Sequence, residues 1–270
     1  MRFDLVSDVH QDMGWRDLSV RTGDSETLVI AGDVGNRVEV TVAAVTALAR
    51  IYREVVFVDG NHEFYSAGGE IDRTRDRLQE AFPANVHYLD RKGPFRLGNT
   101  AFAGANGWYQ FREPSSGSFR AQSEWWSWRS NDARLVFPGG DPRQALERWE
   151  ESKRTLFGQL ECARDDPAVE HVVVVTHSVP HSGGLRDGYV PASNGSYYNG
   201  LFEEAKKAGG GLLGKTRVWC YGHTHHPAFF RDRTSGADVW FAANPRGYRH
   251  ERHNARRNRT IEVDVENPGY

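Results

Sequence analysis

Apolar runs and helically spaced apolar stripes alternate along the first part of the chain. Runs of β-forming residues occupy 3–6, 27–31 and 54–58, and apolar residues recur at helical spacing in 38–52. Residues 71–82 have the charge content of a surface helix. Strands and helices that follow one another at this spacing predict an α/β architecture of stacked layers.

The later part of the chain continues with elements of both kinds. Asp141 before Pro142 is a good start for a helix that we expect to run to Cys162. The run at 171–176 is almost entirely valine, which is typical of a strand buried on both faces. The other expected elements are strands at 86–89, 94–97, 100–103, 217–221, 238–242 and 260–265, a loop at 178–199 and a helix at 201–208.

Residues 107–140 differ in character from the rest of the chain. They combine several tryptophans with several arginines and include the loop signal at 114–118. One interpretation is an aromatic-rich cap that folds over the domain for its own stability. The other is a lid that shapes a substrate pocket, and the two are compatible. We therefore predict one domain over 1–270 that carries an insert at about 107–140.

Composition narrows the class of protein. The chain has 270 residues and a formal net charge of −2, which argues against a dedicated nucleic-acid binder. The basic segment 249–259 is a local exception, which we interpret as a solvated surface segment. Cys162 and Cys220 are the only cysteines, which fits a reduced, cytoplasmic setting. We expect no membrane span and no signal peptide, and the sequence carries no signal for an oligomeric state.

Potential metal ligands stand at the ends of five predicted strands. They are Asp8 and His10, Asp33, Asn61 and His62, His177, and His223 and His225. Histidine, aspartate and asparagine together suit borderline and hard divalent metals, and the absence of cysteine argues against a structural zinc site. The set is too large for one tetrahedral ion and fits two ions that share a carboxylate.

The spacing of these residues also favours a metal site. Asp8 and His10, like His223 and His225, are separated by one residue. If each strand end is extended, both side chains of a pair lie on the same side and can bind together. Strand ends are also where open α/β sheets place their sites.

The ordered motifs resemble the signature of the calcineurin-like metallophosphoesterases. The matching residues are Asp8-x-His10, Gly32-Asp33, Gly60-Asn61-His62-Glu63, His177 and Gly222-His223-x-His225. The resemblance implies a four-layer αββα sandwich of two packed mixed sheets, an α/β fold (α+β in some classifications). It also implies hydrolysis of a phosphate ester by a metal-bridging hydroxide that attacks phosphorus in line, without a covalent enzyme intermediate.

The same resemblance implies two metal sites that share one carboxylate. The first would use Asp8, His10, Asp33 and His225, and the second Asp33, Asn61, His177 and His223. Asp33 would bridge the ions and thereby serve catalysis. His62 would face the substrate and donate a proton to the leaving oxygen or steady the phosphoryl group. We expect Mn²⁺, with Fe, Zn²⁺ and Co²⁺ compatible with the same ligands.

A narrower likeness suggests residues for the substrate. The segments 103–108, 130–132 and 244–248 resemble blocks of small bacterial and phage phosphohydrolases, although residues 178–180 depart from their pattern. On this basis Asn131, Asp132 and Arg246 are candidates for contacts with the substrate or behind the metal ligands. An arginine can hold phosphate oxygens in a bidentate way, while Arg246 can equally brace the C-terminal segment.

Two alternatives remain beside the hypothesis of a metal-dependent phosphatase. A phosphodiesterase or nuclease would use the Arg- and Trp-rich insert and the basic segment 249–259 to hold nucleotides or nucleic acid. A non-catalytic scaffold of the same fold would show gaps in the ligand set, and we find none. We therefore expect a phosphate ester as the partner, with nucleic acid as the less favoured one.

Overall fold

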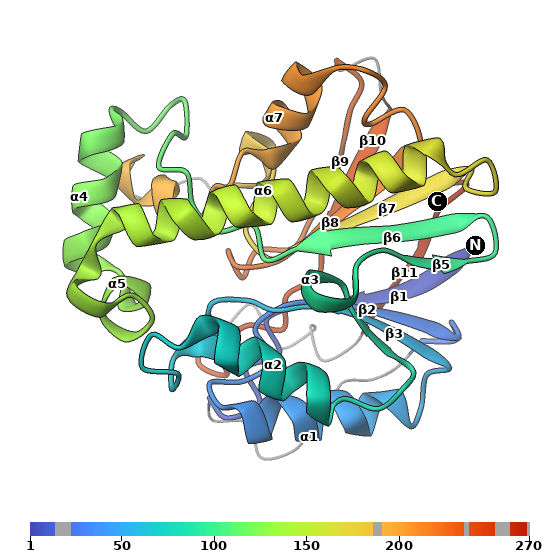
Figure 1. Cartoon of the computed structure of the whole chain (residues 1–270), viewed down its shortest axis with the longest axis horizontal. Helices are drawn as coiled ribbons and strands as arrows, with labels where there is room; N and C mark the ends of the chain where they lie inside the picture. Colours follow the sequence, from blue (N-terminus) through green and yellow to red (C-terminus); the bar gives the residue numbers. More distant parts are fainter. Residues whose placement is uncertain (14–22, 186–190, 235–237, 252–259, 269–270) are drawn as a thin grey trace.

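The computed structural model describes residues 1–13, 23–185, 191–234, 238–251 and 260–268. Two mixed β-sheets pack face to face, and helices cover their outer faces (Figure 1). The expected α/β sandwich of two mixed sheets is therefore confirmed. Within the described ranges, we find no helix with both the length and the apolar character needed to span a bilayer.

The first sheet has five strands in the order β11-β1-β2-β3-β4. Its strands are β1 (Arg2–Val6), β2 (Thr27–Ala31), β3 (Glu54–Val58), β4 (Val86–Tyr88) and β11 (Ile261–Asp264). All pairs are parallel except β1 with β11. Helices α1 (Val38–Ala49) and α2 (Ile71–Ala81) cover its outer face (Figure 1).

The second sheet has six strands in the order β5-β6-β7-β8-β10-β9. Its strands are β5 (Phe95–Leu97), β6 (Thr100–Ala105), β7 (His171–Thr176), β8 (Thr216–Tyr221), β9 (Ala228–Asp232) and β10 (Val239–Ala243). The four inner strands are parallel, and the edge strands β5 and β9 are antiparallel to their neighbours. Helices α6 (Pro142–Asp165) and α7 (Leu201–Ala208) lie over its outer face (Figure 1).

Successive side chains of the central strands enter different layers of the core. On β7, Val173 and Val175 join the cluster between the sheets, whereas Val172 and Val174 join the cluster beneath α6 and α7. Fully burying one such side chain stabilises the fold by roughly 1.5–3 kcal/mol. The valine run at 171–176 is thus apolar throughout because both faces of the strand are buried, as predicted.

The insert forms a helical lobe at one end of the molecule (Figure 1). It contains α4 (Phe119–Arg129) and α5 (Asn131–Leu135), whose first turns are capped by Ser118 and Ser130. Trp126 is fully buried, while Trp128 is 81 % exposed. The lobe therefore joins the apolar core beneath α6 and α7 and also presents aromatic surface.

Several element boundaries differ from the expected ones. The helix α1 ends at Ala49 instead of Tyr52, and residue 89 begins the short helix α3 (Leu89–Lys92) instead of ending a strand. Strand β9 is missing from the prediction because it is an edge strand whose side chains are partly exposed, so its apolar signal is weak. Most of the basic segment 249–259 lies outside the described residues.

Candidate metal centre

The predicted donors come from loops that leave the carboxyl ends of parallel strands in both sheets. Asp8 and His10 follow β1, Asp33 follows β2 and Asn61 follows β3, while His177 follows β7 and His223 and His225 follow β8. All are buried except His223, which is partly exposed. Because the two sheets face each other, their strand ends bring donors from distant parts of the sequence together.

Most of these donors have a left-handed backbone. The φ angles are 50° at Asp8, 44° at His10, 58° at Asp33, 71° at His223 and 51° at His225. The expectation of extended strand ends was therefore wrong, because the chain turns sharply at each of these residues. Such conformations cost roughly 1–3 kcal/mol each for residues other than glycine and cluster at functional sites.

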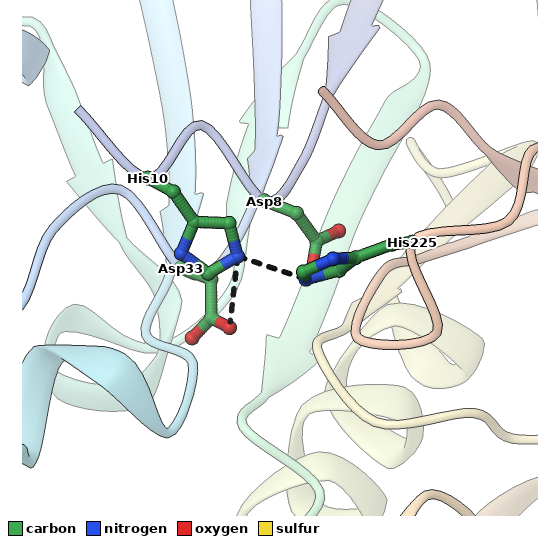
Figure 2. Close-up of side chains that lie close together, drawn as sticks. All are labelled: Asp8, His10, Asp33 and His225. Atoms are coloured by element: carbon green, nitrogen blue, oxygen red, sulfur yellow. Dashed lines mark hydrogen bonds and ion pairs between the residues drawn. The ribbon is translucent and has the colours of Figure 1, made fainter. Parts of the chain in front are cut away.

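The first donor group consists of Asp8, His10, Asp33 and His225. Their ligand atoms all lie within 4.8 Å of one another, and Figure 2 shows the four side chains pointing toward a common centre. His10 Nε2 is 2.9 Å from His225 Nε2 and 3.8 Å from Asp33 Oδ2. Four donors in this arrangement are sufficient to hold one metal ion.

The second donor group consists of Asp33, His177 and His223, again with ligand atoms within 4.8 Å of one another. His177 Nε2 lies 3.2 Å from Asp33 Oδ2, 3.1 Å from His223 Nδ1 and 3.0 Å from Asn61 Oδ1. Asn61 therefore completes this group. Asp33 belongs to both groups, and its other oxygen, Oδ1, accepts a hydrogen bond from the His62 backbone N–H.

Hydrogen bonds on the far side of the histidine rings show that the donor set suits metal ions. His177 Nδ1 lies 2.9 Å from the Ala31 carbonyl, and His223 Nε2 lies 2.9 Å from the Ser196 carbonyl. His225 Nδ1 lies 3.1 Å from both carboxylate oxygens of Glu251. An N–H at each of these positions leaves the other ring nitrogen as a lone-pair donor toward the group, as metal-binding histidines require.

The carboxylates and histidines of the two donor groups shift one another's pKa values. Burial raises the pKa of Asp8, whereas His177 and His62 overcome the effect of burial and hold the pKa of Asp33 well below its usual value. Asp33 in turn raises the pKa of His177 to about 10, against the effect of burial. The buried carboxylate of Asp33 and the ring of His177 thus form a tightly coupled pair, with Nε2 of His177 3.2 Å from Asp33 Oδ2.

His62 faces the same centre from beside the ligands. Its Nδ1 lies 2.6 Å from Asn36 Oδ1, so this nitrogen carries a proton that it donates to the amide oxygen. Its Nε2 lies 3.1 Å from the Tyr248 hydroxyl and 3.9 Å from Asp33 Oδ2. The ring stacks on Tyr65 with centroids 4.0 Å apart. These contacts fix which nitrogen His62 presents to the site.

A cavity of about 260 Å³ opens over the donors. Asp33, Asn61 and His62 line it from the sheets, and Trp125 and Arg129 of α4 line it from the insert. A larger cavity of about 870 Å³ between α6, α7 and the insert contains none of the metal donors. The smaller cavity is therefore the candidate site, because Asp33, Asn61, His223 and His225 line it.

The candidate substrate residues fall in three different settings. Asn131 is exposed and lines the cavity over the donors. Asp132 also lines it, but the side chain is buried and accepts a hydrogen bond from Asn61. Arg246 is fully buried, donates to Gln11 Oε1 at 3.2 Å and is not among the residues that line this cavity. These contacts favour the bracing role for Arg246.

Two acidic residues support the centre in ways that sequence reasoning missed. Glu63 accepts hydrogen bonds from the backbone N–H groups of Asp33, Val34 and Gly60, at 2.7–3.0 Å, and thereby ties two ligand loops together. The signal for Glu63 was its place in the motif at 60–63. Glu251, the partner of His225, gave no signal because it stands outside every recognised motif.

The comparisons with known proteins agree with this geometry. The model of the calcineurin-like phosphoesterase family matches residues 1–227. The uncharacterized protein L509 of Acanthamoeba polyphaga mimivirus is 24 % identical over 254 residues, which are 88 % of this chain and 84 % of the viral protein.

A solved structure supports the same fold. The crystal structure of the phosphopantetheinyl hydrolase from Mycobacterium tuberculosis is similar with a TM-score of 0.71 and 17 % identity, over 96 % of this chain and 95 % of that one. At this identity the likeness shows the fold alone. The family match covers well over half of the sequence and includes every predicted metal ligand. The chain therefore belongs to the calcineurin-like phosphoesterase family.

Proposed function

We propose that the protein hydrolyses phosphate esters with two divalent metal ions, Mn²⁺ being the first candidate. The observation that carries the proposal is the position of Asp33, whose carboxylate belongs to both buried donor groups. Asp8, His10 and His225 would hold one ion with it, and Asn61, His177 and His223 the other.

Bound divalent cations would supply positive charge for the phosphate oxygens and lower the pKa of a water toward neutrality, so that it can attack phosphorus. The protein's own contribution is to fix the donors on loops that Glu63 ties together. His62 is placed to move a proton. Because Asn36 holds the Nδ1 proton, Nε2 is the nitrogen that can exchange a proton with the leaving oxygen.

A phosphodiester or nucleotide substrate is the second candidate. Trp125 and Arg129, which line the cavity from α4, favour it. An aromatic ring can stack on a base, and an arginine can hold a second phosphate. The phosphopantetheinyl hydrolase of similar fold is too distant in sequence to decide between the two substrate classes.

The experiment compares nitrophenyl phosphate with bis-nitrophenyl phosphate, using protein freed of metal and then reconstituted with Mn²⁺. We expect Mn²⁺-dependent turnover of at least one ester, and the ratio of the two rates assigns the monoester or diester class. The Asp33→Asn protein serves as the inactive control. The absence of metal-dependent turnover on both esters and on a wider ester panel would favour the non-catalytic scaffold.

A further inference from the structure

Asp132 is a buried acid of the insert that reaches the metal centre. It lies near the start of α5 and is 3 % exposed. Its carboxylate accepts three hydrogen bonds, each of 2.8 Å. Oδ1 accepts from Asn61 Nδ2 and from the Tyr65 hydroxyl, and Oδ2 accepts from the Tyr109 hydroxyl. Asn61 and Tyr65 belong to the loop after β3, so Asp132 joins the insert to the centre.

The contact with Asn61 determines which end of its amide faces the donor group. A carboxylate only accepts hydrogen bonds, so it must face the NH₂ end of the amide. The carbonyl end, Oδ1, then points to His177 Nε2 at 3.0 Å. If the amide turned over, its NH₂ would face the metal site, and a nitrogen of that kind carries no lone pair for a cation.

A second contact extends from Asp132 toward His223. The Tyr109 hydroxyl that donates to Asp132 lies 3.4 Å from His223 Nε2, and the two rings stack with centroids 5.6 Å apart. Asp132 thus touches Asn61 directly and His223 through one tyrosine. Both belong to the second donor group.

We propose that Asp132 is a positioning residue for the second metal site, where it holds the Asn61 amide with its oxygen toward the ion. The inference rests on the proposed two-metal function. It gives the insert a role beyond covering the pocket, because the affinity of the second ion depends on a side chain that the insert supplies. Residues that orient metal ligands typically contribute about 10–100-fold to metal affinity.

The experiment measures the affinity of both sites by titrating metal-free protein with Mn²⁺ and following free Mn²⁺ by electron paramagnetic resonance. Asp132→Leu keeps most of the volume but has no acceptor, so we expect the second ion to bind about 10–100-fold more weakly while the first is unchanged. Asp132→Asn keeps an oxygen that can accept from Asn61, and we expect most of the affinity to return. Glu124→Leu removes an exposed carboxylate from α4 and should change neither site.

The outcomes separate positioning from other roles. Wild-type affinity in Asp132→Leu refutes the proposal, and an equal loss in Asp132→Leu and Asp132→Asn shows that the charge matters instead of the orientation. Loss of both ions in a folded Asp132→Leu protein shows a general structural role. If that variant does not fold, Asp132→Ser, whose hydroxyl is too short to reach Asn61, replaces it. Wild-type protein that binds fewer than two ions would refute the proposed function itself.

Discussion

Two buried polar clusters lie at the end of β3, and they balance their charges in different ways. In the first, Arg75 of α2 donates to Asp59 Oδ2 at 3.0 Å, to Asp59 Oδ1 at 3.3 Å and to Asp90 Oδ1 at 3.4 Å. Arg75 is 3 % exposed, and Asn106 adds a further hydrogen bond to Asp59. This arginine cluster contains its own cation.

Asn61, a member of the second donor group, lies only two residues after Asp59 in the chain, and the metal centre is the second cluster. It buries the carboxylates of Asp8 and Asp33 among histidines. Five of its donors have positive φ, whereas no residue of the arginine cluster does. The arginine cluster therefore carries its counter-charge within the fold, whereas the metal centre gathers buried carboxylates and histidines that can hold ions on a strained backbone.

The largest effect is expected from Asp33→Asn. A neutral amide bridges two cations poorly, so the variant should lose metal and about 10³-fold or more in rate, corresponding to several kcal/mol of transition-state stabilisation. Elemental analysis and ester hydrolysis measure the two losses. Asp4→Asn, which removes another buried carboxylate from the first sheet, should keep its metals. Two ions per chain at full occupancy in Asp33→Asn would contradict the bridging assignment.

His62→Asn tests the proton donor. We expect both metals to remain and the rate to fall by about 10²–10⁴-fold with an alkyl phosphate, whose leaving oxygen needs a proton. A nitrophenyl ester should lose much less because its leaving group is a weak base. Equal losses on both esters would indicate charge stabilisation instead, and loss of a metal ion would show that His62 is a ligand.

Arg75→Met tests the other side of the comparison. Removing the cation takes the Arg75 salt bridges from the buried carboxylates of Asp59 and Asp90, and breaking a buried ion pair in this way typically costs about 3–5 kcal/mol. Chemical unfolding of the metal-free protein measures the change in the free energy of unfolding. Asp33→Asn, assayed in the same way, should destabilise the metal-free protein far less. Equal destabilisation by the two variants would show that the clusters do not differ as described.

The affinity of the second donor group for a metal ion should depend on pH. In the metal-free protein Asp33 raises the pKa of His177 to about 10, so His177 is protonated at neutral pH. Metal binding must displace this proton, and affinity should therefore fall as pH is lowered below that value, by up to about tenfold per unit. Mn²⁺ titrations at several pH values above and below neutrality measure the slope. An affinity for the second ion that does not change with pH would contradict this expectation.

The two clusters also differ in how far the sequence predicts them. The gathering of the candidate donors was predictable because apolar runs locate the strands, and polar residues directly after parallel strands meet at one edge of the sheets. The sharp left-handed turns were not predictable, since the spacing of Asp8 and His10 is equally compatible with an extended backbone. The arginine cluster was not predicted because Arg75 looks like one more charge on a surface helix until α2 is packed against the sheet.

The role of the insert changes most between sequence and structure. If the insert is a lid, trimming residues 107–140 should alter substrate preference more than metal content. The hydrogen bond from Asn61 to Asp132 argues against a deletion as the test, because trimming would also remove a partner of a candidate metal ligand. Residues 61 and 132 are far apart in sequence, and only the docking of α5 over the site brings them together. The Asp132 variants separate the two roles, which a deletion cannot.

The most direct test of the central claim is the number and coupling of the bound ions. Protein loaded with Mn²⁺ and freed of excess metal is examined by elemental analysis and electron paramagnetic resonance. Because both donor groups share the Asp33 carboxylate, we predict two ions per chain with an exchange-coupled spectrum. One ion per chain, or two ions whose spectra are those of isolated Mn²⁺, would contradict a metal centre bridged by Asp33.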